Sequence, residues 1–455
     1  MKKVSLIVAA IALCGLAAST FADVQNIRLS GDIRVRGYLS DAAGKDNIAP
    51  NKQTRNDVQF VTQRTRVTVE ADLEDHVTAV VTLQANGIWG DPASRKAGAN
   101  GTSRTFAVGV SEAYVQLREL FYSPATLKIG RQSLNYGTGL IISSADQMYT
   151  FDAGRLVLDY HPLTIDIVGA QLDNSQTFSP NTTAAPLGGQ SDMLFLNAKY
   201  EVNSVVKNVE AYFGWVSQSG TNQAFGNQPL GVACPSPMIL GLRTDLTPIE
   251  NLTASLEGAY ELGNSSSVAG LADKNISAYL LKAEAKYVLK GVAWTPTFNA
   301  SYTYASGDSD LIAPGAAAST RHYFLPWFNM ADGNNGYVLA PLLSNIQIIN
   351  LGASVKPCAN TTLALQGYYY LKANKNGSCL QNISDPRANL GGFGFTTANS
   401  DSRDIGAEID AIIGYDYSKD VRCQLVYAAF LPENAYEGVA SRIVNQVRGE
   451  INVKF

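Results

Sequence analysis

Arginine recurs at alternate positions in two neighbouring stretches of the sequence, and this spacing indicates electrostatic chemistry. Arg28, Arg34 and Arg36 fall in the first stretch, and Arg64 and Arg66 fall in the second. Side chains two residues apart share one face of a β-strand. Consecutive strands usually lie side by side, so we expect the five arginines to form one basic patch. Such a patch attracts anionic solutes and holds them loosely.

Further charges of both signs fall on the polar faces of other alternating stretches. Arg243 and Arg448 add cations. The acidic residues on these faces are Asp32, Glu70, Asp72, Glu112, Glu257, Glu408 and Asp410. We interpret the whole set as the lining of an interior space and expect it to control which solutes enter. The alternative for each residue is simple solvation of a polar wall.

Hydrolysis through an activated nucleophile is the main catalytic alternative, and it usually needs a histidine beside a serine or an acid. Three histidines occur in the whole chain. His76 and His161 fall in short connections, and His322 falls in the longest one. None falls on a face of an expected strand, so we predict that the protein is not an enzyme. No spacing of residues indicates a metal or a cofactor.

The elements that would position these charges are short segments in which apolar and polar residues alternate. In the last segment Val447, Gly449, Ile451, Val453 and Phe455 share one face. We count about eighteen such segments, each near the ~9–11 residues that a tilted strand needs to cross a bilayer. They centre on residues 27–39, 59–73, 77–88, 107–117, 126–134, 153–160, 163–172, 192–202, 208–217, 238–246, 252–262, 276–287, 295–306, 345–356, 361–372, 404–416, 421–431 and 445–455.

The connections between these segments alternate between short and long. The short ones are residues 74–76, 160–162, 203–207, 247–251, 357–360 and 417–420. The long ones, rich in Gly, Asn, Ser and Pro, are residues 40–58, 89–106, 135–150, 173–191, 218–237, 307–344 and 373–403. Outer-membrane barrels have short periplasmic turns and long external loops. The pattern predicts an all-β fold, a transmembrane antiparallel β-barrel of about 18 strands that forms one domain over residues 23–455, with both termini in the periplasm.

Residues 1–22 have the features of a secretory signal peptide. Lys2 and Lys3 precede an apolar run, and we expect cleavage after Ala22. That run is the only one that approaches the ~20 residues of a membrane helix, which excludes an α-helical membrane protein apart from an uncleaved anchor. Cleavage would change the formal charge from -4 to -6, because two lysines leave with the signal. An acidic chain of this kind disfavours nucleic-acid binding, and we expect it to reside in the bacterial outer membrane.

The five cysteines are compatible with two disulfides or with free thiols. Cys14 leaves with the signal, and the spacing of the others matches no zinc motif. The expected topology places Cys234 and Cys379 in external loops, and Cys358 and Cys423 at the periplasmic rim. Only the pairs 234–379 and 358–423 keep both partners on one side of the membrane.

Four groups of residues give the chain a resemblance to the alginate export family of outer-membrane barrels. They are Leu127-Lys-Ile-Gly-Arg-Gln132 with Tyr136-Gly137, Phe151-Asp-Ala-Gly-Arg-Leu156, Ala305-Ser-Gly-Asp308 before a loop with Phe324 and Trp327, and Gly406-Ala-Glu-Ile-Asp410 with Phe430-Leu-Pro432. The resemblance implies eighteen strands. It also implies that Arg131, Asp152 and Arg155 lie at a constriction inside the barrel. The aromatic ending at Phe455 resembles the closing strand of bacterial outer-membrane barrels, which their assembly machinery recognises.

Arg131 interrupts the apolar face of its own strand, after Leu127 and Ile129. A charge that faces lipid at mid-membrane costs roughly 2–4 kcal/mol. We therefore expect Arg131 to turn inward through a bulge, or to lie near a rim, with Asp152 as a partner for it or for Arg155.

The function that follows from these features is passive transport by a monomeric barrel in lipid. The chain length suits 16–18 strands, which leave an aqueous channel, and is too short for a plugged barrel. We expect an anionic polysaccharide or a small hydrophilic anion as the solute. Acids roughly match bases in the expected lining, which keeps a smaller or less acidic solute than alginate open. The alternatives are a general or sugar-uptake porin and a surface adhesin or structural barrel.

Overall fold

A computed structural model of the protein describes residues 26–42, 56–90, 106–145, 150–174, 190–219, 235–265, 274–307, 320–325, 327–328, 335–375, 402–435 and 443–455. The expected signal peptide, Cys234, Cys379 and Asp308 lie outside these residues.

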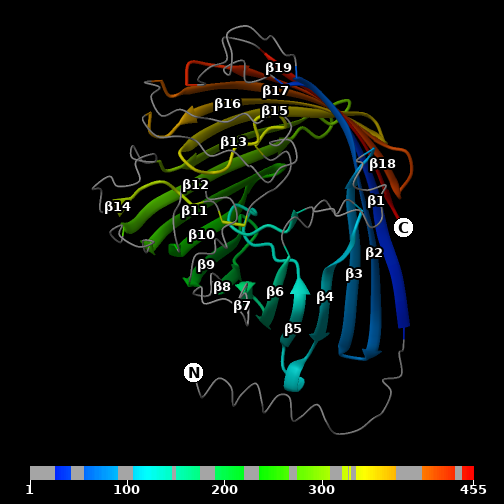
Figure 1. The fold of residues 1–455 in the computed structure, drawn as a ribbon, viewed down its shortest axis with the longest axis vertical. Helices are drawn as coiled ribbons and strands as arrows, with labels where there is room; N and C mark the ends of the chain where they lie inside the picture. Colours follow the sequence, from blue (N-terminus) through cyan, green and yellow to red (C-terminus); the bar gives the residue numbers. More distant parts are fainter. Residues whose placement is uncertain are drawn as a thin grey trace, which may run out of the picture.

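Antiparallel strands form a closed ring (Figure 1). The sheet has 19 strands, of which β14 is a two-residue strand that pairs in parallel with β12, so eighteen strands make the wall. The last strand pairs with the first, which closes the ring. The strands are β1 (Asn26–Ala42), β2 (Asn56–Glu74), β3 (Val77–Ile88), β4 (Val108–Leu117), β5 (Ala125–Gln132), β6 (Phe151–Tyr160), β7 (Leu163–Asn174), β8 (Gln190–Glu201), β9 (Val206–Ser219), β10 (Pro235–Ile249), β11 (Leu252–Ser265), β12 (Lys274–Val288), β13 (Thr297–Ala305), β14 (Thr320–Arg321), β15 (Ile346–Cys358), β16 (Thr361–Lys372), β17 (Asp404–Asp416), β18 (Val421–Pro432) and β19 (Val444–Lys454).

The predicted barrel of about eighteen strands is confirmed. The short connections of the sequence join neighbouring antiparallel strands, as between β6 and β7 or between β17 and β18. One further short element, the 3-10 helix η1 (Leu120–Tyr122), joins β4 to β5. Among the described residues no helix has the length and apolar character needed to span a membrane.

The two faces of the wall differ because side chains alternate along each strand. Leu29 and Leu351 are both 64% exposed on the outside, where lipid replaces water around an embedded barrel. On the inside, charged side chains such as Glu257 and Glu408 are buried. A wall of this kind needs internal partners for its buried charges.

Two chain segments fold into the ring and supply those partners. Residues 133–144 follow β5, and residues 322–325, 327–328 and 335–345 precede β15. The segments meet where Ile142 bridges Phe328, and the Ser143 amide donates to the Phe328 carbonyl at 2.8 Å. In Figure 1 the teal chain after β5 runs inside the ring of strands.

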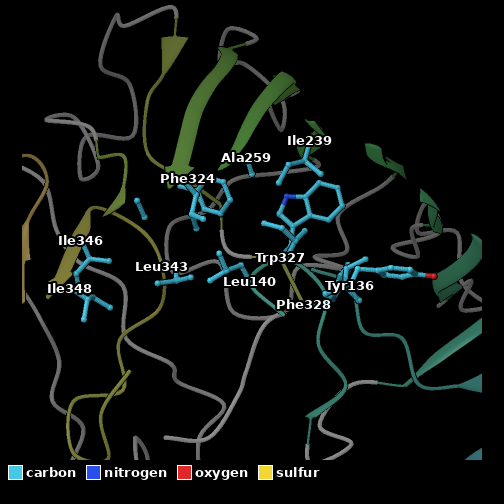
Figure 2. Close-up of a cluster of buried hydrophobic side chains, with 14 of the residues drawn as sticks. Tyr136, Leu140, Ile239, Ala259, Phe324, Trp327, Phe328, Leu343, Ile346 and Ile348 are labelled. Carbon is cyan, nitrogen blue, oxygen red and sulfur yellow. The ribbon is translucent and has the colours of Figure 1, made fainter. Parts of the chain in front are cut away.

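Apolar side chains of both segments pack with the inner wall in one core (Figure 2). Trp327 lies close to Ile239 of the wall, with Phe328 and Tyr136 beneath it. The rings of Phe328 and Phe151 meet edge to face at 5.2 Å. The sequence predicts an open interior. The structure differs because the free energy falls when these apolar side chains leave water and pack together.

Cys358 and Cys423 are free thiols. They lie on β15 and β18, with β16 and β17 between these strands in the ring. The disulfide 358–423 that the sequence left open is therefore absent, whereas the pair 234–379 stays outside the described residues.

Candidate functional site

Arginines gather on the inner face of β1, β2 and β19. Arg34 stands directly opposite Arg64, and Asp32 stands opposite Arg66. The carboxylate of Asp32 accepts a hydrogen bond from Arg64 at 3.0 Å and another from Arg66. One carboxylate thus serves two guanidinium groups, and their combined charge stays positive.

Two further arginines extend this group across the seam of the barrel. Arg36 pairs with Glu450 of β19. Arg448 donates to the Gln424 side chain at 3.1 Å and lies over the ring of Tyr337 at 4.4 Å. We call Arg34, Arg36, Arg64, Arg66 and Arg448 the arginine wall. Among the described residues of these strands, Asp32 and Glu450 pair with members of the arginine wall, whereas Glu70 and Asp72 pair with Arg28.

Arg28 does not join the arginine wall, although it lies on the same strand as Arg34. Its guanidinium binds Glu70 at 2.6 Å and Asp72 at 2.8 Å, and the side chain is 48% exposed. It lies at the start of β1, beside the short turn between β2 and β3. The expected patch of five arginines is therefore split, because acids at the periplasmic end neutralise Arg28.

The acids on the inner wall bind the two inward segments. Glu408 accepts hydrogen bonds from the backbone amides of Tyr337, Val338 and Leu339 at 2.6, 2.7 and 3.0 Å. Tyr370 donates its hydroxyl to the same carboxylate at 3.2 Å. A buried carboxylate is tolerated when donors surround it in this way.

Glu261 holds the same long segment at a second point. Its two carboxylate oxygens accept the Leu325 amide at 2.8 Å and the Trp327 indole N–H at 2.7 Å. The sequence analysis did not single out Glu261. The available signal is its spacing: Glu261 lies four residues after Glu257 on β11, so both side chains fall on the inner face of that strand.

Three more acids bind the shorter segment. Glu257 accepts the amide and the hydroxyl of Thr138 at 2.9 and 2.6 Å. Asp166 accepts the Tyr136 hydroxyl at 2.9 Å and also pairs with Arg155 at 2.5 Å. Burial raises the pKa of the Tyr136 hydroxyl well above its usual value, so this group stays protonated as the donor. Glu112 accepts the Ser133 hydroxyl at 2.5 Å.

Arg131 and Asp152 lie apart from Arg155, on the outward side of the wall. They form a two-point pair at 2.7 and 2.8 Å and are 43% and 54% exposed. Alternation continues through the end of β5, where Gln132 points inward and is fully buried, so no bulge turns Arg131 into the barrel. The expected constriction of three residues is corrected here. Only Arg155 faces the interior, and the other pair lies at the external ends of β5 and β6.

The remaining expected residues lie on the inner wall. Arg243 binds Glu210 at 3.1 Å and Asp245 at 2.7 Å. Asp410 is fully buried beside the Glu408 position, and its carboxylate oxygens accept no hydrogen bond from the described residues. Arg243 is held by these two acids of its own part of the wall, whereas the Asp410 carboxylate lies within the electrostatic influence of Arg448 of the arginine wall.

The four sequence motifs lie where the inward segments leave or contact the wall. Gln132 donates to the carbonyls of Gly130 and Ala153 at the end of β5. Ser306 accepts the amides of Phe324 and Asn345 through its carbonyl, which holds both ends of the long segment together. The ring of Phe430 packs on Tyr370, the partner of Glu408. These motifs therefore shape the interior of the barrel.

A cavity of about 680 Å³ lies beneath the inward segments. Strands β9 to β13, β15 and β16 form its wall, across the ring from β1 to β3 in Figure 1. Thr138 and Asn335 of the inward segments border it. It contains four cations and two acids, which are Lys207, Arg243, Lys282, Lys286, Asp245 and Glu284.

The histidines of the catalytic alternative are not among the residues that line this cavity. His76 and His161 approach Glu119 and Glu201 at 3.8 and 3.9 Å on the exposed short turns. His322 lies near the Ser277 carbonyl at 3.1 Å. No group of three potential metal ligands occurs within the described part of the chain.

A family model described as alginate export matches residues 29–449. Among solved structures, OccAB1 of Acinetobacter baumannii is similar with a TM-score of 0.57 at 14% identity, over 96% of this chain and 98% of that one. OpdK of Pseudomonas aeruginosa, solved with vanillate, is similar with a TM-score of 0.55 at 11% identity, over 94% and 98%. The comparison with curated proteins gave no match. At these identities the solved structures support the fold alone.

Proposed function

Because the chain belongs to the alginate export family, and its fold is an outer-membrane β-barrel, we propose that it is a passive, anion-selective channel. The solute is an anionic saccharide or a small hydrophilic anion. The observation that carries the proposal is the arginine wall, where Arg34, Arg36, Arg64, Arg66 and Arg448 outnumber the carboxylates of Asp32 and Glu450.

The contacts of the acids explain why nearly equal numbers of charges need not cancel. Glu408, Glu261 and Glu257 accept hydrogen bonds from the inward segments. The N–H dipoles that point at each of these carboxylates offset part of its negative charge. The field along the path is then governed by the arginine wall and by the lysines of the cavity.

We propose that the protein lies in the outer membrane and that its signal peptide is removed by cleavage after Ala22. Phe455 is exposed at the end of the chain, next to β1, where an assembly factor could contact it. We propose recognition by the barrel assembly machinery through this residue, and a monomer as the working unit. The vanillate in the OpdK structure supports a small carboxylate as a solute for barrels of this fold.

The test is the reversal potential of the refolded mature protein in a planar bilayer with a salt gradient. We expect anion selectivity that decreases in Arg34→Gln. The matched control is Arg131→Gln, because Arg131 lies on the outward side of the wall. Cation selectivity in the unmodified protein would exclude the proposal and favour a general or sugar-uptake porin. A closed barrel without current would favour an adhesin or structural role.

A further inference from the structure

The cavity beneath the inward segments has a wall whose chemistry differs from that of the arginine wall. On β12 the cations Lys282 and Lys286 are four residues apart, so they share the inner face. In the register of β12 and β13, Lys282 stands opposite Thr303, and Lys286 stands opposite Asn299. Directly opposite side chains are about 4.5–5.5 Å apart at Cβ. Each lysine therefore has a neutral hydrogen-bonding group beside it.

An amide cluster continues this neutral surface on β13, β15 and β16. Asn299 donates to the side-chain oxygens of Asn350 at 2.9 Å and Gln366 at 3.0 Å. Gln366 donates back to Asn299 at 3.1 Å. Each amide has two N–H groups and an oxygen with two lone pairs, so the cluster retains capacity for further hydrogen bonds. Its members are already held in place, which reduces the entropy that a ligand must overcome.

The cavity has more cationic than acidic side chains, and two of its lysines form no ion pair among the described residues. Lys282 pairs with Glu284 at 2.8 Å, and Arg243 lies between Glu210 and Asp245. Lys207 and Lys286 are exposed and have no ion pair among the described residues. An anion entering from the periplasmic turns would meet these two lysines first, since β9 begins at Val206.

We infer that this cavity is a binding subsite for a small polyhydroxylated carboxylate, a sugar acid. The inference rests on the proposed function, because it names the class of solute. The carboxylate would contact Lys286 and Lys207, and the hydroxyl groups would contact Asn299 and Asn350, which Gln366 holds in place by hydrogen bonds. A volume of about 680 Å³ lies within the range of small-molecule pockets, roughly 300–1,000 Å³.

The neighbours of the cavity favour a small solute over a polymer. Thr138 and Asn335 border it from the inward segments, and Glu257 fixes Thr138 by two hydrogen bonds. Among the described residues that line the cavity, Tyr368 is the one aromatic residue, and it is largely buried. Stacking surfaces for neutral sugars or aromatic acids are therefore minor here, and hydrogen bonds with charge remain the means of recognition.

The experiment uses the mature protein and three probes of similar size: glucuronate, glucose and cyclohexanecarboxylate. Binding is measured by calorimetry in detergent and, separately, by block of the ionic current from the periplasmic side. We expect glucuronate to bind at least about tenfold more tightly than either other probe, the equivalent of one hydrogen-bonded contact. Glucose lacks the charge, and cyclohexanecarboxylate lacks the hydroxyl groups.

Two variants separate the contributions of charge and of the amides. Lys207→Gln with Lys286→Gln should weaken glucuronate binding about tenfold, whereas Lys290→Gln, at an exposed turn outside the cavity, should leave it unchanged. Asn350→Leu should remove the preference for glucuronate over cyclohexanecarboxylate. Each variant is first checked for the shift in gel mobility that a folded barrel undergoes on heating.

The outcomes distinguish this inference from the proposed function. Equal binding of glucuronate and cyclohexanecarboxylate, or no effect of the two lysines, would overturn the subsite while anion selectivity could persist. A glucuronate trimer that binds much more tightly than the monomer would replace the small-solute site with a polymer site. Cation selectivity of the unmodified protein would overturn the proposed function, whatever the calorimetry gives.

Discussion

At the residue scale, Glu408 concentrates four hydrogen bonds on one buried carboxylate. The three amides of Tyr337, Val338 and Leu339 and the Tyr370 hydroxyl all donate to it. Hydrogen bonds to a charged group contribute about 1.5–3 kcal/mol each. A single substitution here should therefore loosen the long inward segment while the wall remains intact.

We predict that Glu408→Gln raises the single-channel conductance. Glutamine has one acceptor oxygen and brings two N–H groups that cannot accept from the loop amides. Single-channel recording measures the effect, and Glu119→Gln in the exposed short connection serves as the control. An unchanged conductance would mean that the segment stays in place without this carboxylate.

Asp32 is a second residue where one carboxylate carries two interactions. It accepts from Arg64 and Arg66, and it is itself buried. We predict that Asp32→Asn increases anion selectivity, because two cations lose their shared counter-charge. It should also lower stability, since breaking a buried pair costs about 3–5 kcal/mol. Reversal potentials test this, with Asp75→Asn on the exposed turn as the control; a shift toward cations would contradict it.

At the element scale, the strands could be predicted from the sequence and the inward segments could not. The alternation of apolar and polar residues, and of short and long connections, can be read from the sequence directly. It predicts the position of each wall strand to within a few residues. The positions of Trp327 and Val338 depend on partners far along the chain, Glu261 and Glu408. The sequence pattern predicts that Glu408 faces the interior, but it does not single out Glu261. Nothing in the pattern identifies what either acid binds.

Arg131 illustrates the same limit for a single strand. The break in its apolar face was visible, and burial in the lumen was one physical solution. The structure has the other solution, because β5 is short and ends one residue later at Gln132. A charge at the rim, paired with Asp152, avoids the hydrocarbon without a bulge.

Trp327 is the apolar anchor of the long inward segment. It packs in the core and donates its indole N–H to Glu261. Truncating a buried tryptophan to alanine costs roughly 3–5 kcal/mol. We predict that Trp327→Ala raises conductance and its fluctuation, while the heat-induced gel shift of the wall is retained. Trp294→Ala, on an exposed turn, is the control, and a lost barrel in Trp327→Ala would show that the segment is needed for folding.

The pairing of β4 with β5 requires a glycine at position 130. Its φ is +128°, and an added Cβ would lie 2.2 Å from the Ala113 carbonyl oxygen. We predict that Gly130→Val prevents efficient refolding, measured by the fraction of protein with the mobility of the folded barrel. Gly154→Val is the matched control, because a Cβ at Gly154 would meet no atom within 4 Å. Equal yields from the two variants would contradict the prediction.

At the scale of the whole molecule, the charges are arranged in separate regions of one ring. The arginine wall lies on β1, β2 and β19, and the lysines of the cavity lie on β9 and β12. Acids between them hold the inward segments. The lumen therefore has two positive surfaces for a solute, although the chain as a whole is acidic.

We predict that anion selectivity decreases as salt concentration rises. The Debye length falls from about 10 Å at 0.1 M to about 3 Å at 1 M. A selectivity based on the charge of the wall must then weaken, because ions in the lumen screen it. Reversal potentials at a constant concentration ratio and increasing total salt measure this. A selectivity that persists at 1 M salt would indicate a filter that depends on size.

The pairing of β1 with β19 means that the ends of the chain could be moved to another turn of the barrel. Gly31 and Phe455 exchange backbone hydrogen bonds at 2.8 and 3.1 Å, so the first and last strands are joined as an ordinary antiparallel pair. Antiparallel pairs of this kind continue around the whole ring. A circular permutant that links residue 455 to residue 26 and opens at the turn near Asn203 would retain every strand partner. The order of synthesis and the order of strands in the wall are thus separable, and a new pair of ends could carry a label or a tether without touching the lumen.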